Sequence, residues 1–225
     1  MRDSDRPPVL AHRRFVADRH SFSGLNLQQR FQRIHDTNLW GAEASVSGLG
    51  SEVDATATLR AELPPLLMRL GATSLLDAPC GDAGWIARAD LPVRVIGIDI
   101  VPDLIERLRA RAARGEILGE YHLADITRDP LPRADVVLCR DCLVHFSFAN
   151  IARAVENFRS SGATWLITTT FPEGQQNADC EDGDWRALNF QRAPFNWGQP
   201  AELLNENCTE AGGGWRDKSL GAWRL

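Results

Sequence analysis

Apolar positions after residue 70 fall into short runs, separated by stretches with helical spacing. The runs predict five strands, at 74–78, 93–98, 121–124, 134–139 and 164–170. Apolar residues three and four apart predict helices at 103–114 and 148–160, and 82–89 has room for a short one. Strands that alternate with helices in this way predict an α/β fold with a doubly wound, mostly parallel sheet covered on both faces.

The N-terminal part of the chain follows a different pattern. Residues 1–24 are rich in Arg, Asp, Pro and Ser and lack sustained periodicity, which predicts a mobile or loosely packed leader. A short helix is expected at 28–38. A second helix is expected at 54–70, with leucines on one face and Gly71 as its stop. A Gly/Ser loop at 45–51 joins the two helices.

The C-terminal part contains a long irregular stretch at 172–198, followed by a predicted helix at 200–211 and one or two closing strands at 215–225. We therefore divide the chain into an N-terminal leader and lid, 1–53, and a main domain, 54–225. The irregular stretch is expected to be an insertion on the substrate side of that domain.

Net charge and hydropathy narrow the classes of function. The chain has 225 residues, with 25 Lys and Arg against 30 Asp and Glu and a formal net charge of −5. An acidic chain is a poor electrostatic binder of nucleic acid, so we expect no nucleic-acid partner. No apolar run approaches about 20 residues, and the N-terminus lacks the apolar core of a signal peptide. We expect no membrane partner and a cytoplasmic protein.

Five cysteines are an odd number in a chain with no export signal, so a disulfide framework is not expected. Cys139 and Cys142 have the C-x-x-C spacing of zinc and redox sites. Tetrahedral zinc needs two further soft ligands, and neither Cys180 nor Cys208 has a nearby partner. Because Cys139 closes an apolar strand, we expect buried structural thiols and no metal.

Acidic residues end three successive predicted strands, at the edge of the sheet where ligands bind in such folds. Asp77 ends the first strand and precedes a turn that contains Gly81. Asp99, 22 residues later, ends the second strand, where a carboxylate can accept both hydroxyls of a ribose. Asp125 follows the third strand and can accept from an exocyclic amine such as that of adenine. Each alone is equally typical of a helix cap, but together they predict one nucleoside site.

These strand ends carry ordered motifs. Residues 75–84, 96–99, 124–126 and 135–145 resemble the motifs of class I S-adenosylmethionine-dependent methyltransferases, whose fold is Rossmann-like. This likeness covers about residues 55–170. A narrower likeness, to a group of bacterial small-molecule methyltransferases, rests on residues 38–41, 45–51, 77–82, 139–145 and 217–221. The usual Gly-x-Gly-x-Gly turn reads Pro-Cys-Gly-Asp-Ala at 79–83, which weakens a dinucleotide interpretation more than a methyltransferase one.

The resemblance implies S-adenosylmethionine as the cofactor and S-adenosylhomocysteine as its product. It implies that Asp99 holds the ribose and that Ile100 packs on one face of the adenine. Asp125 and the backbone of Ile126 would bind the edge of the adenine ring.

The methionine portion of the cofactor would be bound at the first strand end, by Asp77 and Gly81 and by the backbone around Ala78 and Cys80. Arg140 follows the fourth strand and would meet the methionine carboxylate, a pairing that suits a guanidinium. Arg60 is the rival for that task, with a solvent-exposed position on a helix as the alternative.

His145 is the candidate catalytic residue, because it follows the fourth strand near the expected position of the reactive methyl group. An imidazole can take the proton of a hydroxyl or ammonium nucleophile near neutral pH. The alternative is a histidine that packs against the cofactor or caps the next helix. Asp141, in the same turn, would orient His145 or bind a substrate cation, or else serve as a capping residue.

A lid must come from outside the sheet, and Trp40, the loop 45–51 and the stretch 172–198 are the available material. Trp40 is assigned to cofactor binding, with simple packing as the alternative. The candidate substrate-binding residues are Trp185, Arg186 and Asn177.

The function that these residues favour is S-adenosylmethionine-dependent methyl transfer to an oxygen or nitrogen of a small polar acceptor, such as a natural product, sugar or nucleotide-sugar derivative. Oxygen is slightly favoured, because no Asn-Pro-Pro-Tyr-like run follows the fourth strand. A nucleoside-binding regulatory or scaffold protein without catalysis is the alternative from another class. An NAD(P)-dependent dehydrogenase is disfavoured, since Tyr121 and Lys218 are poorly placed as its catalytic pair. Metal dependence and the oligomeric state stay open.

Overall fold

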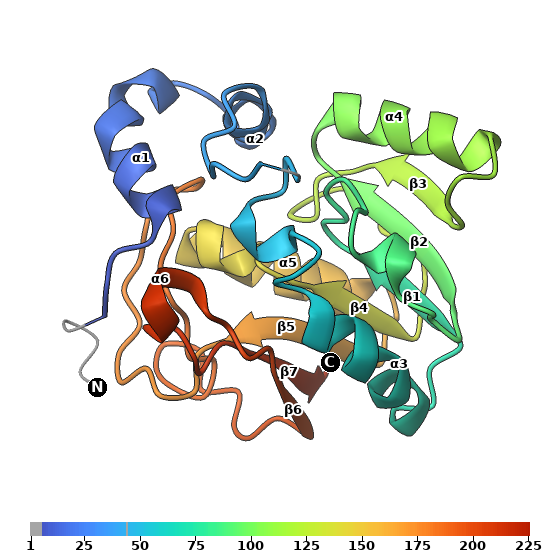
Figure 1. Ribbon diagram of the computed structural model, residues 1–225. Helices are drawn as coiled ribbons and strands as arrows, with labels where there is room; N and C mark the ends of the chain where they lie inside the picture. The colour runs from blue at the N-terminus through green and yellow to red at the C-terminus, as the bar shows by residue number, and fades with distance from the viewer. Residues whose placement is uncertain (1–5, 44) are drawn as a thin grey trace.

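The computed structural model describes residues 6–43 and 45–225, and it contains the predicted α/β fold (Figure 1). Within these residues one sheet of seven strands has the order β3-β2-β1-β4-β5-β7-β6. Neighbours from β3 to β5 are parallel, whereas β7 is antiparallel to both β5 and β6. The strands are β1 (Ser74–Asp77), β2 (Arg94–Asp99), β3 (Glu120–Leu123), β4 (Val136–Cys139), β5 (Trp165–Thr170), β6 (Glu202–Asn205) and β7 (Ser219–Arg224).

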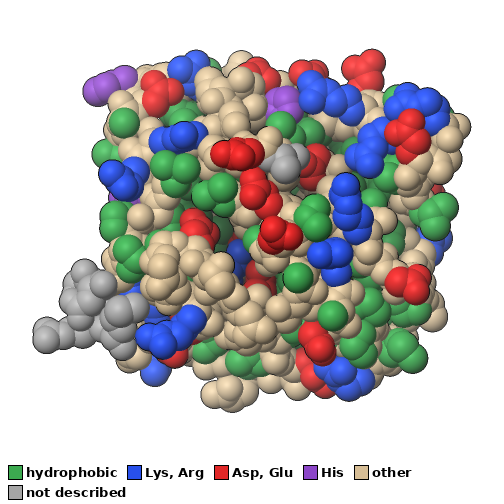
Figure 2. Space-filling model, in the orientation of Figure 1, with side chains coloured by type: hydrophobic (Ala, Val, Ile, Leu, Met, Phe, Trp, Pro, Cys, Tyr) green, Lys and Arg blue, Asp and Glu red, His purple; other side chains and the backbone are tan. Residues whose placement is uncertain are grey.

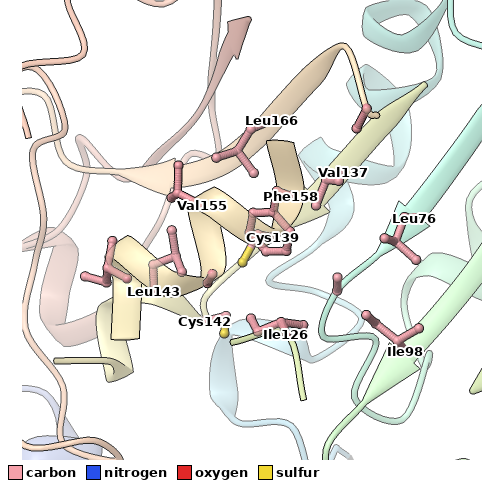
Figure 3. Close-up of a cluster of buried hydrophobic side chains, with 14 of the residues drawn as sticks. Leu76, Ile98, Ile126, Val137, Cys139, Cys142, Leu143, Val155, Phe158 and Leu166 are labelled. Carbon is pink, nitrogen blue, oxygen red and sulfur yellow. The ribbon is translucent and has the colours of Figure 1, made fainter. Parts of the chain in front are cut away.

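Helices cover both faces of the sheet, because successive residues of a strand point to opposite faces. Leu76 of β1 packs toward α5 (Phe148–Ser160), in the cluster of buried side chains that Figure 3 shows. Its neighbour Leu75 packs on the other face, in a cluster with residues of α3 (Ala57–Arg69) and α4 (Pro102–Ala113). The inner parallel strands β2, β1, β4 and β5 are therefore mostly buried between two helical layers, as the sequence predicts, whereas Tyr121 is the one buried residue of the edge strand β3.

The cysteines of the C-x-x-C motif belong to the first of these layers. Cys139 and Cys142 are buried, and their sulfur atoms lie among aliphatic and aromatic side chains between the sheet and α5 (Figure 3). All five thiols of the chain are free. The prediction that these two cysteines are buried is confirmed.

No helix in residues 6–43 and 45–225 is both long and apolar enough to cross a membrane. The longest helices, α3 and α5, have 13 residues each, against about 20 that a span needs.

The prediction of a loosely packed leader is wrong for the described part of it; residues 1–5 lie outside the described residues. Residues 10–22 form α1 (Leu10–Asp18) and a 3-10 turn, followed by α2 (Leu27–Asp36). Phe15 and Phe22 are fully buried against each other, with their ring centroids 4.8 Å apart. The helix was missed because Phe15 is its only buried residue, so it has no apolar periodicity.

The predicted helix at 200–211 is also wrong. Its first half is β6, which pairs with β7, and only α6 (Glu210–Gly213) is helical. Leu203 and Leu204 form an apolar run too short to distinguish a strand from a helix, and the sheet edge decided the outcome. At 82–89 the predicted helix is reduced to a 3-10 turn at Ile86–Arg88.

We predict that Phe15→Ala lowers the free energy of unfolding by about 3–5 kcal/mol, because it leaves a cavity under α1. The matched control is Val16→Ala, one residue along the same helix, where the side chain is 51% exposed. Urea unfolding should show a small change for the control. Equal, small losses in both variants would mean that α1 does not contribute to the core.

Candidate functional site

A cavity of about 960 Å³, including its open mouth, lies at the carboxyl ends of the parallel strands, and Phe31, Ile34 and His35 of α2 line it. It brings together most of the residues that the sequence analysis singled out as cofactor-binding or catalytic. Those that line it are Trp40, Asp77, Cys80, Gly81, Asp99, Ile100, Asp125, Ile126, Arg140, Asp141 and His145. Ala78 is not among them.

The turn that follows β1 fixes the position of the Asp99 carboxylate by hydrogen bonding. Its carboxylate accepts hydrogen bonds from the backbone N–H of Gly81 at 3.0 Å and of Val101 at 2.9 Å. Gly81 has a φ of +52°, and a β-carbon there would collide with the hydroxyl of Ser47, so only glycine fits. Burial raises the pKa of Asp99 to about 6, although the two backbone hydrogen bonds lower it.

Asp77 is a buried carboxylate with no side-chain hydrogen bond to any described residue. Burial raises its pKa well above the usual range, and the nearby Asp99 raises it further, while Arg140 opposes both. The N–H of Ala78 donates to the carbonyl of Leu138 within the sheet at 2.8 Å. Its carbonyl is the backbone group that could accept from the amino group of a ligand, so the role of Ala78 stays a prediction.

Asp125 lies after the end of the third strand, and its carboxylate already accepts hydrogen bonds within the turn that follows. Its carboxylate accepts from the N–H of Thr127 at 2.9 Å and from its hydroxyl at 2.7 Å, and pairs with Arg128 at 3.1 Å. The Asx-type turn fixes its position at the cavity wall.

The loop 45–51 lies against the turn after β1. Ser45 donates its hydroxyl hydrogen to the carboxylate of Asp82 at 2.8 Å, and the Ser47 hydroxyl accepts from the Asp82 N–H at 3.0 Å. Ser47 and Ser51 line the cavity. Sequence analysis missed them individually, although the Gly/Ser composition of the loop marked the segment.

Four charged side chains form a buried network beside the cavity. Arg140 donates to Glu206 through its Nε at 3.2 Å and one Nη at 2.7 Å, and the same Nη donates to the carbonyl of Gly50 at 2.8 Å. Lys218 lies 2.6 Å from the carboxylate of Asp141 and 3.4 Å from that of Glu206. Glu206 and Lys218 were not predicted; the available signal was that Lys218 is the only lysine in the chain.

This network corrects the expected role of Asp141. Its carboxylate pairs with Lys218 and lies 3.3 Å from Arg140, and it makes no hydrogen bond to His145. Burial opposes ionisation of Asp141, but the charges of Lys218 and Arg140 outweigh it and hold its pKa well below the usual range. Asp141 is therefore a fixed anion within the network and does not orient His145 directly.

His145 is buried and held from two sides. Its Nδ1 lies 2.8 Å from the carbonyl oxygen of Asp184, and its ring stacks on Trp40 with centroids 4.6 Å apart. A carbonyl only accepts, so Nδ1 carries the hydrogen and Nε2 has the free lone pair. Burial lowers the pKa of His145 to about 4, which keeps the ring neutral at pH 7.

A second cavity, of about 590 Å³, adjoins the first. The two share four lining residues: Trp40, Ser47, Asp141 and His145. The rest of the wall of the second cavity combines small and aliphatic residues of 9–11 and 48–50 with Cys208, three aromatic rings and two charged side chains: Phe171, Trp185, Trp215, Glu210 and Lys218. Trp185 is thus the one predicted substrate-binding residue that lies here.

Arg186 and Asn177 line neither of these two cavities, so the structure does not bring these two predicted substrate-binding residues together with Trp185 in the second one. The Arg186 guanidinium donates to the carbonyls of Leu143, Phe146 and Ala178. Asn177 bonds only to backbone groups of residues 189–193. Both side chains satisfy the backbone of a stretch that lacks sheet hydrogen bonds.

Arg60 also lies outside both cavities, where it donates to the carbonyl of Val53 at 3.1 Å. The alternative, a solvent-exposed helix position, describes Arg60 only in part, because its side chain is half-buried and its Nε is buried.

Known proteins share this fold. Residues 75–161 match the family model of a methyltransferase domain. The structure of magnesium protoporphyrin IX methyltransferase (ChlM) from Synechocystis PCC 6803, with bound SAM, is 14% identical; the match covers 90% of this chain and 99% of that chain, with a TM-score of 0.54. N-methyltransferase NodS from Bradyrhizobium japonicum WM9 is 17% identical, over 76% of this chain and 98% of that chain, with a TM-score of 0.52.

A third match is weaker. The PH0226 protein from Pyrococcus horikoshii OT3 is 20% identical, and the match covers 55% of this chain and 58% of that chain, with a TM-score of 0.45. No curated protein matches the sequence significantly.

We predict that Glu206→Gln lowers the free energy of unfolding by about 3–5 kcal/mol, because Arg140 and Lys218 would then share one buried carboxylate. The control is Glu202→Gln, which removes the partly exposed pair with Arg69. That change should cost about 1 kcal/mol or less. Urea unfolding of both variants measures the difference, and a loss at Glu206 no larger than at Glu202 would contradict it.

Proposed function

We propose, on the premise that this chain carries a class I S-adenosylmethionine-dependent methyltransferase domain, that it methylates an oxygen or nitrogen of a small polar acceptor bound in the second cavity. The observation that carries the proposal is the pair of adjoining cavities that meet at Trp40, Ser47, Asp141 and His145. Methyl transfer needs a cofactor site and an acceptor site separated by the length of one reacting bond.

The first cavity fits the cofactor in charge. Asp77 is a buried carboxylate without a hydrogen-bond donor among the described residues, which suits a ligand with positive charges such as an ammonium and a sulfonium. Asp99 accepts two backbone hydrogen bonds and retains lone pairs for the ribose hydroxyls. These residues would hold the methionine and ribose portions.

The residues that would bind the adenine and the methionine carboxylate of the cofactor are those that the sequence analysis expects. Two of them, Asp125 and Arg140, already make hydrogen bonds within the protein. Ile100 and Ile126 supply apolar contacts for the ring, and Asp125 keeps only part of its acceptor capacity. The Nε and one Nη of Arg140 donate hydrogen bonds to Glu206 and Gly50. The second Nη is therefore the group that could bind a cofactor carboxylate.

When bound, the cofactor supplies a methyl group on a sulfonium, a neutral leaving group. The protein then has to position the nucleophile and exclude water. Neutral His145, with its Nε2 lone pair available, can accept a hydrogen bond or a proton from the acceptor. Trp40 stacks on the ring and holds it at the boundary of the cavities.

Contacts within the chain disfavour the other two functions. A dehydrogenase would need Tyr121 and Lys218, but the Tyr121 hydroxyl donates to the Leu118 carbonyl and Lys218 is paired with Asp141. A nucleoside-binding protein without catalysis would need only the first cavity, and the second cavity favours an enzyme. The face in Figure 2 mixes acidic and basic side chains without a continuous basic stripe, which supports a small acceptor.

We predict that Asp99→Ala weakens binding of S-adenosylmethionine by about tenfold or more, because hydrogen bonds to a charged group contribute about 1.5–3 kcal/mol each. Affinity of the unmutated protein should fall as the pH drops through about 6, where the Asp99 carboxylate becomes protonated. Asp99→Asn should lack the step near pH 6 and keep only the pH dependence that comes from Asp77. Isothermal titration measures all three.

The control for that experiment is Asp90→Ala, since Asp90 is exposed and outside both cavities. Unchanged cofactor affinity in folded Asp99→Ala would refute the ribose assignment.

We predict that His145→Ala lowers kcat by about 10²–10⁴ and leaves cofactor affinity nearly unchanged. Its pKa of about 4 means that no His145 titration should appear in the rate between pH 6 and 8, since the ring is already neutral there. His145→Gln separates the roles: recovery of kcat indicates that Nε2 orients the acceptor, and no recovery indicates proton transfer. Near-normal kcat in both variants would return His145 to a packing role.

A further inference from the structure

We propose that the acceptor is an amine that enters in its protonated form on an apolar or aromatic group, with Glu210 and the aromatic wall of the second cavity as its binding site. This inference rests on the proposed function, because it names the substrate class of the same site. It also moves the choice between oxygen and nitrogen to nitrogen.

The charges around the second cavity leave one uncompensated carboxylate. Arg140 and Lys218 are balanced by Asp141 and Glu206, so the buried network is neutral as a whole. Glu210 lines the cavity and has no hydrogen bond or ion pair from its carboxylate to any described residue. The cavity therefore has an excess negative charge of one, and a cation complements it.

Lys218, the one cationic side chain among the described residues that line the second cavity, does not reverse the preference of this cavity for a cationic ligand. Its ammonium already lies 2.6 Å from Asp141 and 3.4 Å from Glu206, so its charge is offset before any ligand arrives. Burial raises the pKa of Glu210; the charge of Lys218 opposes this rise without cancelling it, and the charge of Asp141 adds to it. A ligand ammonium would provide a second cation beside the carboxylate.

The aromatic wall suits the rest of such a ligand. Trp185 is in edge contact with Trp215 and Phe171, with centroids 4.8 Å and 5.9 Å away. One face of Trp215 already has the Arg6 guanidinium 5.0 Å from its centre, so these rings bind cations within the protein itself. Trp40 forms the side of the cavity nearest to the cofactor site.

The reaction at nitrogen is balanced by groups already described. One proton leaves the ammonium through His145 Nε2 to solvent, and the freed electron pair forms the new N–C bond. The electron pair of the broken C–S bond stays on sulfur, and the methylated nitrogen leaves with one positive charge. A hydroxyl is a far weaker acid than an ammonium, so a weakly basic His145 serves an amine better than an alcohol.

The test uses the full chain loaded with S-adenosylhomocysteine and sets of three ligands that differ only in charge. One set is 2-phenylethylamine, 2-phenylethanol and phenylacetate, and equivalent sets carry indolyl and cyclohexyl groups. Isothermal titration at neutral pH and low salt should show the amine binding about tenfold tighter than the alcohol, with the carboxylate weakest. With S-adenosylmethionine, mass spectrometry should detect the N-methylated amine.

Glu210→Gln should remove the preference for the amine over the alcohol, and the control Glu202→Gln, on β6 outside both cavities, should retain it. Trp185→Phe should keep more of the amine affinity than Trp185→Leu, because only phenylalanine preserves an aromatic face. Binding of S-adenosylhomocysteine, measured first in every variant, shows that each is folded.

Equal affinity for amine and alcohol, tighter binding of the carboxylate, no binding by any amine, or no effect of Glu210→Gln would overturn this inference. If S-adenosylhomocysteine binds and the alcohol is the ligand that is methylated, the proposed function stands and only the amine assignment fails. If S-adenosylhomocysteine does not bind the unmutated protein, both fail.

Discussion

The buried network of Arg140, Asp141, Glu206 and Lys218 is the constraint on which the rest of the site depends. It joins the turn after β4 to the end of β6 and the start of β7, and Arg140 extends it to the carbonyl of Gly50. Taking four charges out of water is costly, and such networks contribute little net stability compared with an apolar core. The network instead fixes the relative positions of the segments that it joins, because displacement of any one of them would leave an unpaired buried charge.

The network holds the turn after β4 in place, and this turn determines where the two cavities meet. Asp141 has a φ of +49°, an unusual backbone conformation for a residue other than glycine, and its N–H donates to the hydroxyl of Thr169 at 2.8 Å. The turn that it begins brings His145 against Trp40 from the N-terminal layer. Segments from three distant parts of the chain thus build the boundary at which a methyl group and its acceptor would face each other.

The first cavity shows a different balance between function and stability. Asp77 is buried close enough to Asp99 for the Asp99 charge to raise its pKa further, an arrangement that a protein selected for stability alone would avoid. The cost is tolerable because the β1 turn supplies N–H donors to Asp99, and a bound cation would relieve Asp77. Binding of a positively charged cofactor should therefore stabilise the fold by mass action.

The sequence by itself determined the parallel sheet, its five parallel strands and the edge at which their acidic ends lie, because these follow from local patterns. A buried parallel strand is an apolar run, and the residue after it lies at the carboxyl edge whatever the rest of the chain does. Asp77, Asp99 and Asp125 could be placed on that basis alone. Helix α1 and strand β6 could not, since each depends on a partner far away in sequence.

Only the tertiary structure decided which residues line the second cavity and form the charged network beside it. Lys218 is 77 residues from Asp141, and Glu206 is 66 residues from Arg140, so no local spacing announces their pairing. Arg186 and Asn177 had suitable chemistry for a substrate, but the irregular stretch that carries them uses both to satisfy its own backbone. Whether a polar side chain faces a ligand or a neighbouring carbonyl depends on the path of the folded chain around it, because buried backbone groups must find partners before a ligand can.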